Sequence, residues 1–243
     1  MSDHRWLVLN LEAPLLAFGG VRIDHIGVTR DFPSLSMMTG LLANALGYVR
    51  TEWEKHQNLQ DQLVFAARWD RHNPSGLLTD TQNAKLEREA EGWTTWGEPE
   101  GRGGGVNTYK APHRRLRDYH MDAHVKVVLR LKEEAMGLDL DKLASRLNSP
   151  VRPLFIGRKP CLPSGPLLPP DPFVVAPTAY AALQRVPGED RLRALWPLEE
   201  GPSKGDSVDR ILDLPDIRNW RTGLHGGVRK IVEGKVRPER QVA

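Results

Sequence analysis

The segment from residue 33 to 47 constrains the fold most, because its spacing predicts a helix with two unlike faces. At about 100° per residue, its long apolar side chains gather on one side, as is typical of a helix that packs against a core. The other side has small residues where a surface helix normally has charged ones, and each glycine there costs roughly 1 kcal/mol of helix stability. The apolar side comprises Leu35, Met38, Leu42, Ala45 and Leu46, and the small side comprises Ser36, Gly40, Ala43 and Gly47. The small side would let another backbone lie close, although it also fits an ordinary helix packed on a neighbouring loop.

The order of the predicted elements indicates an α+β fold. Apolar runs and alternation predict strands over 5–11, 63–70, 121–132 and 151–157, and helical spacing predicts helices over 34–48 and 139–148. This sequence of elements is the βαββαβ order of ferredoxin-like folds, which RNA-recognition (RRM-like) modules share. We therefore expect a ferredoxin-like palm over 1–162. Clustered prolines after residue 163 predict a smaller C-terminal region, 163–243, of short strands and loops.

The stretch from residue 73 to 112 interrupts this order. It holds few aliphatic residues and a glycine-rich run around Arg102, so it cannot form a core of its own. It also contains Trp93 and Trp96, which would either stack on nucleic-acid bases or anchor the stretch to the body. The sequence predicts a long excursion with a mobile tip.

Basic residues cluster at two places that could meet the helix. The net charge of +3 and the pI near 9.1 permit nucleic-acid binding without arguing for it, so local clustering has to carry the electrostatic argument. The clusters comprise Lys110, His113, Arg114, Arg115 and Arg117, and the pair Arg158 and Lys159. Each could be a solvated turn. Together with the helix start at Ser34 and Ser36, whose amides would attract anions, they predict a surface that binds a phosphate backbone.

Several classes of protein are disfavoured. The chain has no G-x-S-x-G, P-loop or H-E-x-x-H motif, and its eight histidines are scattered, so we expect no metal site and no cofactor. A single cysteine, Cys161, rules out a disulfide framework and fits a reducing, cytoplasmic setting. We expect no membrane segment, because no run of 18 apolar residues occurs.

Two alternatives to an RNA-binding subunit remain open at this point. A metal-independent endoribonuclease needs only a tyrosine, a histidine and a cation in mutual reach, which Tyr48, His113 and Lys110 could supply. A protein-only scaffold would bind partner subunits and no RNA.

Several short motifs follow one another in a fixed order. They are Leu11-Glu12-Ala13-Pro14-Leu15, Gly19-Gly20, Pro33-Ser34, Gly40-Leu41-Leu42, Ala45-Leu46-Gly47, Arg68, Asp80-Thr81-Gln82, Asp122-Ala123 and Pro153-Leu154-Phe155-Ile156-Gly157-Arg158-Lys159-Pro160-Cys161. Through these motifs the chain resembles the CRISPR-associated Cas five (CasD) family over roughly residues 5 to 168. The last motif, which ends in Gly-Arg-Lys-x-Cys, is similar to the type I-E branch. Late in the chain, Leu212-Asp213-Leu214-Pro215 resembles the family's Asp-x-Pro, whereas residues 220–228 depart from the family's basic ending.

The resemblance implies a non-catalytic RNA-binding subunit of the Cascade surveillance complex, which acts in antiviral defence. The ferredoxin-like (RAMP) palm would grip the 5′ handle of the CRISPR RNA and cap the backbone filament, and a long β-hairpin thumb at about 73–112 would reach the neighbouring subunit. The implied partners are the CRISPR RNA, the Cascade backbone subunits and large subunit, and target DNA within the complex.

The resemblance also implies which residues bind RNA. The thumb residues would be Trp93, Trp96 and Arg102. A related branch cuts precursor CRISPR RNA, and Tyr48, Lys110 and His113 would be its catalytic residues here, although the 157–161 ending favours the non-cutting branch. The RNA-binding residues would be Gly19, Gly20, Arg22, Ser34, Ser36, Gly40, Asn44, Arg68, Arg114, Arg115, Arg158 and Lys159.

Overall fold

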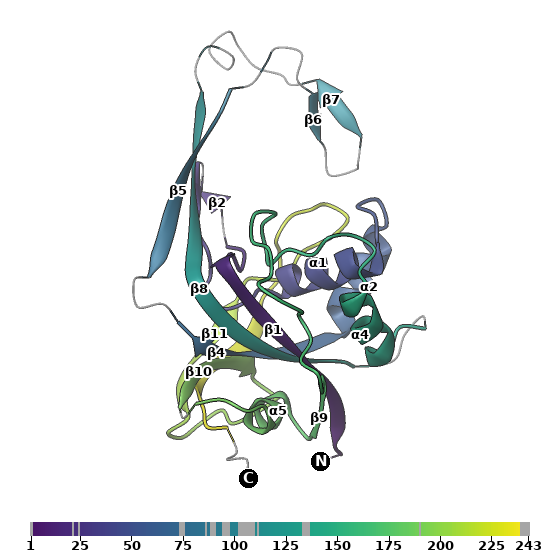
Figure 1. Ribbon diagram of the computed structural model, residues 1–243, viewed down its shortest axis with the longest axis vertical. Helices are drawn as coiled ribbons and strands as arrows, with labels where there is room; N and C mark the ends of the chain where they lie inside the picture. Colours follow the sequence, from purple (N-terminus) through teal and green to yellow (C-terminus); the bar gives the residue numbers. More distant parts are fainter. Residues whose placement is uncertain are drawn as a thin grey trace.

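The computed structural model describes residues 2–20, 22–23, 25–72, 76–85, 87, 91–93, 98–101, 110, 112–132, 137–189 and 191–238. Within these residues, ten strands form one sheet, and helices cover both of its faces (Figure 1). The pairing is antiparallel except for β3, which runs parallel to β8. The predicted α+β class is confirmed.

Four neighbouring antiparallel strands form one half of the sheet, with β9 at its edge. In spatial order they are β4 (Leu63–Arg71), β8 (His113–Leu131), β1 (His4–Leu16) and β9 (Phe173–Ala176). With α1 (Leu35–Leu46) before β4 and α4 (Leu140–Asn148) before β9, the chain follows the predicted order of strand, helix, strand, strand, helix, strand. The alternation along β1 separates two cores, because Leu7 and Leu9 face one of them and Trp6 and Val8 face the other.

The prediction of a strand over 151–157 is wrong. This segment is irregular, and Gly157 has a φ of 90°, which no regular strand accommodates. Ile156 is fully buried, and its carbonyl accepts a single hydrogen bond from the Ala17 amide at 3.3 Å. The apolar run therefore reflects a buried loop, and β9 takes the expected place beside β1.

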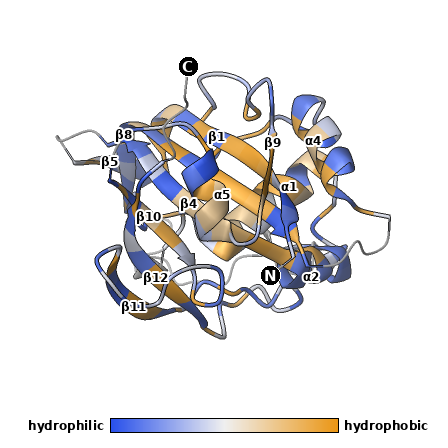
Figure 2. Cartoon of the chain, turned by 90° about the horizontal axis from the view of Figure 1, so that it is seen from below, coloured by the Kyte–Doolittle hydropathy of each residue, from blue (hydrophilic) through white to orange (hydrophobic). Residues whose placement is uncertain are grey.

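The helices divide between the two faces of the sheet. The predicted helices α1 and α4 pack on the face that contains Leu7, whereas α5 (Ala179–Arg185) packs on the opposite face (Figure 2). Neither α5 nor α2 (Trp53–Gln62) was predicted from the sequence. Helix α2 escaped prediction because its buried residues are only His56, Leu59 and Gln60, which form no apolar stripe in the sequence.

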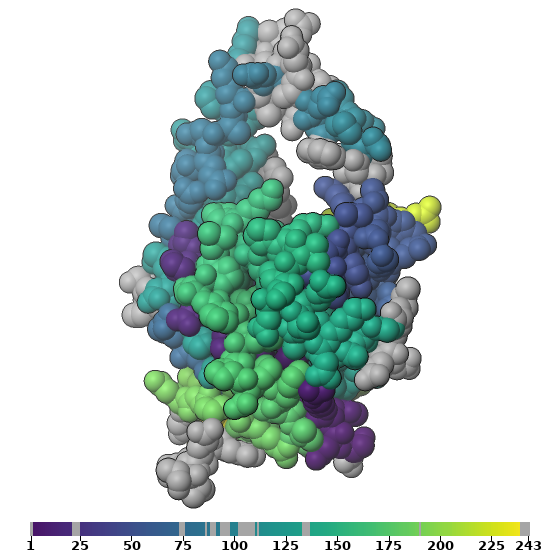
Figure 3. Space-filling view, turned by 45° about the vertical axis from the view of Figure 1, so that its right-hand side comes forward, coloured from purple at the N-terminus to yellow at the C-terminus, as the bar shows by residue number. Residues whose placement is uncertain are grey.

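The predicted excursion begins and ends in a long two-stranded ribbon. Strand β5 (Leu77–Ala84) pairs with the first part of β8, residues 113–120, so β8 begins eight residues before the predicted start at Met121. Beyond the ribbon, β6 (Glu91–Trp93) pairs with β7 (Pro99–Gly101), and in Figure 3 these residues project above the body of the molecule. Trp96 and Arg102 lie outside the described residues.

The C-terminal strands extend the same sheet. Strand β10 (Leu192–Pro197) pairs with β4, and β12 (Arg229–Val236) lies between β10 and β11 (Val208–Leu214). Because β9 to β12 all belong to this sheet, the domain boundary at 162/163 stays a prediction. The short strands β2 (Arg22–Ile23) and β3 (Ile26–Gly27) complete the sheet, and no described helix has the length and apolar character needed to cross a membrane.

Between β11 and β12 the chain leaves the sheet. This part, residues 215–228, is called the crossing segment below. It contacts α1 through Asp216 and α2 through Arg218 and Trp220. It thereby brings the end of the chain beside the helix whose small flank the sequence singled out.

Candidate nucleic-acid interface

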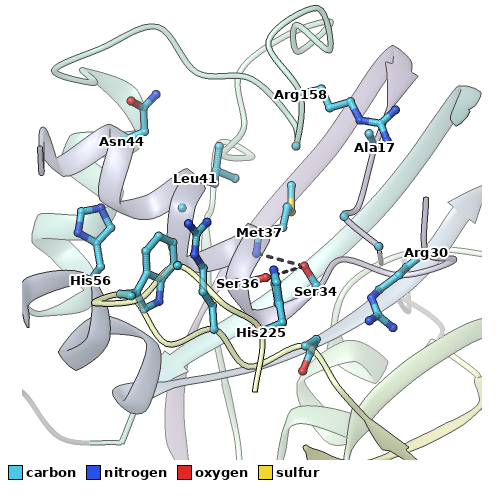
Figure 4. Close-up of a pocket in the computed structure, with 18 of the residues that line it drawn as sticks. Ala17, Arg30, Ser34, Ser36, Met37, Leu41, Asn44, His56, Arg158 and His225 are labelled. Carbon is cyan, nitrogen blue, oxygen red and sulfur yellow. Dashed lines mark hydrogen bonds between the residues drawn. The ribbon is translucent and has the colours of Figure 1, made fainter. Parts of the chain in front are cut away.

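A cleft of about 920 Å³ lies beside α1. Its walls are the turn after β1, one flank of α1, the irregular segment 152–158 and the crossing segment (Figure 4). Four segments far apart in the sequence therefore meet around one cavity. The predicted site residues that line it are Gly19, Gly20, Ser34, Ser36, Gly40, Asn44, Tyr48 and Arg158.

The small flank of α1 is partly open and partly covered. Ser36, Gly40 and Asn44 line the cleft, and a Cβ atom at Gly40 would meet only the Trp220 ring, at 3.9 Å. Ala43 is buried instead, and Gly47 ends the helix with a φ of 84° under the side chain of Val151. The flank thus gives another backbone access to the first and middle turns of the helix and not to its end.

The sequence predicted that the amides at the start of α1 would bind an anionic ligand, but in the structure these amides face the protein itself. Asp216 fills this position: its Oδ2 accepts from the Leu35 amide at 2.8 Å, and its carbonyl accepts from the Ser36 amide at 3.3 Å. The Met37 amide donates to Ser34 Oγ at 3.2 Å. The carboxylate of Asp216 is buried and also bonds to Arg229. The anion expected at the helix start is therefore the protein's own carboxylate.

Glycines let the walls of the cleft approach one another. A Cβ atom at Gly157 would lie 1.5 Å from the Ala17 carbonyl oxygen, so a side chain at this position cannot fit while the 153–158 segment lies against the turn. At Gly19, which has a φ of 81°, an added Cβ atom would lie 3.0 Å from Ser34 Oγ. The absence of a side chain at these two glycines therefore shapes the mouth of the cleft.

Five arginines line the cleft, and several of them are held by backbone carbonyls. Arg152 donates to the carbonyls of Gly47 and Tyr48, and Arg158 to those of Asp118 and Gly27, each near 2.8 Å. Asp216, neutralised by Arg229, is the only carboxylate among the described residues of the lining. The cleft therefore carries a net positive charge and favours an anionic ligand. The five arginines are Arg30, Arg50, Arg152, Arg158 and Arg218.

The pKa values of two histidines of the cleft are lowered by burial and, in addition, by this positive potential. Burial lowers the pKa of His56, and Arg218 and Arg152 lower it further against the effect of Glu52. Burial also lowers the pKa of His225, with Arg218 and Arg30 as additional causes and Asp216 opposing them. Both side chains are neutral at pH 7, since an unperturbed histidine has a pKa of about 6.5.

Arg68 does not reach the cleft or any other surface. Its side chain is fully buried, and all five of its donors are used by Asp70 and by the carbonyls of Leu183, Val186 and Pro187. It joins β4 to the end of α5, and no donor remains for a phosphate. The prediction that Arg68 binds RNA is therefore incompatible with its position.

The other predicted cations lie outside the cleft. Arg114 and Arg115 are on β8, paired with Asn83 and Gln82 in the ribbon, and Lys159 is exposed beside the cleft without lining it. Arg22 and Trp93 are described only as backbone in β2 and β6. The structure thus separates the predicted basic residues into a cleft group and a ribbon group.

The structure does not bring the three residues of the endoribonuclease alternative into one site. Tyr48 lines the cleft, whereas His113 opens β8 opposite Ala84 in the ribbon, and Lys110 is an exposed residue of the excursion. The neighbours of the Tyr48 ring are His56, at 5.7 Å between centroids, and Lys55, at 5.4 Å. Burial raises the pKa of Tyr48.

Sequence reasoning missed Arg30, Arg50, Arg152, Arg218 and Asp216. None of these residues lies in a charge cluster, and they meet only because the crossing segment returns to α1. The one available signal was the motif ending at Pro215, which directly precedes Asp216.

Comparisons with known proteins agree along most of the chain. A family model described as CRISPR-associated protein (Cas_Cas5) matches residues 6–232. The CRISPR system Cascade subunit CasD of Escherichia coli strain K12 is 26% identical over 162 residues, which cover 67% of this chain and 69% of that protein. A chain of a CRISPR RNA-guided surveillance complex is similar with a TM-score of 0.62 and 21% identity, covering 97% of this chain and 95% of that one. The crystal structure of a Cas protein is similar with a TM-score of 0.59 and 25% identity, covering 97% and 98%.

Proposed function

Because the chain belongs to the Cas5 family of CRISPR-associated proteins, we propose that it is an RNA-binding subunit of a CRISPR RNA-guided surveillance complex. Its role is to hold the 5′ handle of the CRISPR RNA in the cleft beside α1 and to cap one end of the backbone filament. The central strands and α1 and α4 then serve as the ferredoxin-like palm, and the β5–β8 ribbon serves as the base of the thumb.

The observation that carries this proposal is the charge of the cleft. Five arginines surround one cavity, and the one carboxylate in the described lining is already paired with Arg229. Arginine is suited to this role, because its fork of donors binds phosphate oxygens and its charge does not titrate near pH 7. The flank at Ser36 and Gly40 gives a ribose-phosphate backbone room to lie against the helix.

The proposal extends to partners in the complex. The backbone subunits would meet the ribbon and the β6–β7 sheet, and the ribbon arginines Arg114 and Arg115 would contact RNA as it leaves the handle. The large subunit would contact the C-terminal region, and target DNA would pair with the RNA elsewhere in the complex. We propose no catalytic turnover, because Tyr48, Lys110 and His113 share no site.

RNA binding as a function of salt tests the proposal. The probe is an RNA that carries the repeat-derived 5′ end of the host's CRISPR transcripts. We expect the double variant Arg30→Ala/Arg158→Ala to bind it at least about tenfold more weakly, with a smaller slope of log affinity against log salt, by about 0.7 for each lost phosphate contact. A double variant of two arginines outside the cleft, Arg5→Ala/Arg210→Ala, removes the same charge and should keep the wild-type slope.

Two results would contradict the proposal. One is a full-length protein that binds no such RNA, which would favour a protein-only scaffold. The other is cleavage of the RNA at one position in EDTA, lost in His113→Ala, which would favour the endoribonuclease.

A further inference from the structure

Arg218 lies in the cleft, and none of the residues that the structure describes is a polar partner for its guanidinium. Its backbone is fixed to α2, because its amide donates to Gln60 Oε1 at 3.2 Å and its carbonyl accepts from Gln60 Nε2 at 2.9 Å. The guanidinium carbon lies 4.8 Å from the centroid of the Trp220 ring. Nε is buried, and no acceptor reaches it within the described part of the chain. Packing alone therefore holds this side chain in place.

Arg218 shares its end of the cleft with other cations. Burial lowers the pKa of its guanidinium, and Arg50 lowers it further. Arg152 also belongs to this group, since it lines the same cleft and acts together with Arg218 on His56. A half-buried cation with like-charged neighbours is unfavourable unless an anion compensates for the lost hydration.

The carboxylates around this end of the cleft are engaged elsewhere. Glu52, at the start of α2, pairs with Lys55, and Asp216, on the crossing segment itself, pairs with Arg229. Neither forms a hydrogen bond to Arg218 in the described structure. Since none of the described residues supplies a counter-ion, an anionic ligand would compensate this charge.

We propose that Arg218, together with Arg50 and Arg152, forms a phosphate subsite at the α2 end of the cleft. The subsite rests on the proposed function and takes one phosphate of the bound RNA. A phosphate suits it better than a protein carboxylate, because a phosphate offers more anionic oxygens to several converging arginines. Trp220 keeps the subsite rigid: its indole Nε1 donates to Gln60 Oε1 at 3.1 Å, and its ring stacks on His56 with 4.8 Å between centroids.

The test is the substitution Arg218→Met in the full-length protein, because methionine keeps the packing on Trp220 and removes only the charge. The probe is again the RNA with the repeat-derived 5′ end, titrated at several KCl concentrations. We expect the affinity to fall about tenfold at about 0.1 M salt, and the salt slope to fall by about 0.7, the value for one phosphate contact in a single strand. Without RNA, the thermal midpoint of the variant should rise, because an unpaired cation is gone.

Arg221→Met is the matched control. Arg221 lies three residues further on in the crossing segment and also packs over an indole, that of Trp53 at 5.6 Å. It is exposed and does not line the cleft. The control loses the same charge and should keep the wild-type salt slope.

The outcomes separate the subsite from the proposed function. Wild-type RNA binding with an unchanged slope in Arg218→Met overturns the subsite and leaves the function standing, whereas absent wild-type binding overturns both. A lower thermal midpoint without RNA would make Arg218 a structural residue, and loss of subunit assembly at an unchanged slope would assign it to a partner carboxylate; both overturn the subsite.

RNAs with 5′-hydroxyl and 5′-phosphate ends locate the phosphate that the subsite binds. Equal losses of affinity for the two RNAs indicate an internal phosphodiester, and a loss with the phosphorylated RNA alone indicates the terminal group.

Discussion

The start of α1 and the neighbouring wall at α2 treat buried charge in opposite ways. At the start of α1, Asp216 accepts hydrogen bonds from the Leu35 amide and from Arg229, so the carboxylate is paired within the chain. At α2, Arg218 has a buried Nε with no acceptor among the described residues. Both residues belong to the crossing segment, only two positions apart. Asp216 is satisfied by the protein itself, whereas the unpaired Nε of Arg218 needs another explanation, which the proposed phosphate subsite supplies.

The largest effect on stability should come from removing the buried carboxylate at the start of α1. Asp216→Ala leaves Arg229 without its partner and the Leu35 amide without an acceptor, in a region where the carboxylate is 1% exposed. Breaking a buried pair by removing one partner typically costs about 3–5 kcal/mol. We therefore expect the free energy of unfolding, measured with urea, to fall by about 3–5 kcal/mol.

The control for this substitution is Asp213→Ala. Asp213 lies three residues earlier, its side chain is 60% exposed, and its Oδ1 is 3.7 Å from Lys230 Nζ. Exposed pairs of this kind contribute about 0–1 kcal/mol. Equal losses in the two variants would mean that burial at the start of α1 does not distinguish Asp216.

A smaller effect of the opposite sign should appear at Gly40, on the open flank. Gly40→Ala should raise the free energy of unfolding by about 0.5–1 kcal/mol, because alanine favours the helix and its Cβ meets only the Trp220 ring at 3.9 Å. Gly40→Leu fills the flank and should weaken RNA binding while the protein stays folded. Fluorescence anisotropy and urea unfolding measure the two quantities.

Gly165→Leu serves as the control for side-chain size, because Gly165 is exposed, faces open space and does not line the cleft. It should leave RNA affinity unchanged. If Gly40→Leu binds RNA as well as Gly165→Leu does, the flank of α1 is not a binding surface.

The sequence predicted the parts of the molecule that local periodicity controls. The helix at 35–46 and the half-buried strand at 121–131 follow from the spacing of their own apolar residues. The prediction of a strand over 151–157 was wrong because a short apolar run is equally compatible with a strand and with a buried loop. In the ribbon, residues 113–120 lack a strong apolar pattern, since this part of β8 pairs with β5 and only Tyr119 and His120 at its end are buried.

The candidate site was only partly predictable for a different reason. Gly19, Gly20, Ser36, Gly40 and Arg158 were found because they belong to compact motifs, and all of them line the cleft. Whether an arginine is free or engaged depends on contacts distant in sequence. Arg68 is bound by carbonyls more than 110 residues away, and Arg218 is held by Gln60, 158 residues away. No local pattern carries that information.

The smallest expected effect concerns how stability depends on pH. The comparison is between two histidines of the cleft and one histidine of the core. Burial lowers the pKa of His56 and of His225 in the cleft, and it lowers the pKa of His120 in the core beside Trp69. As the pH falls below about 6.5, the unfolded chain takes up protons that these folded side chains resist, so stability decreases with acidification.

RNA should change this behaviour in the cleft alone. A phosphate near Arg218 adds negative charge that favours protonated histidine, so the pKa values of His56 and His225 should rise on binding while that of His120 stays constant. Titration of the histidine ring signals by NMR, with and without the RNA, measures all three pKa values in one sample. A shift of equal size at His120 would point to a general change in the fold. Constant pKa values at His56 and His225 would place the bound phosphates away from Arg218, and the contrast between Asp216 and Arg218 would then lose its functional meaning.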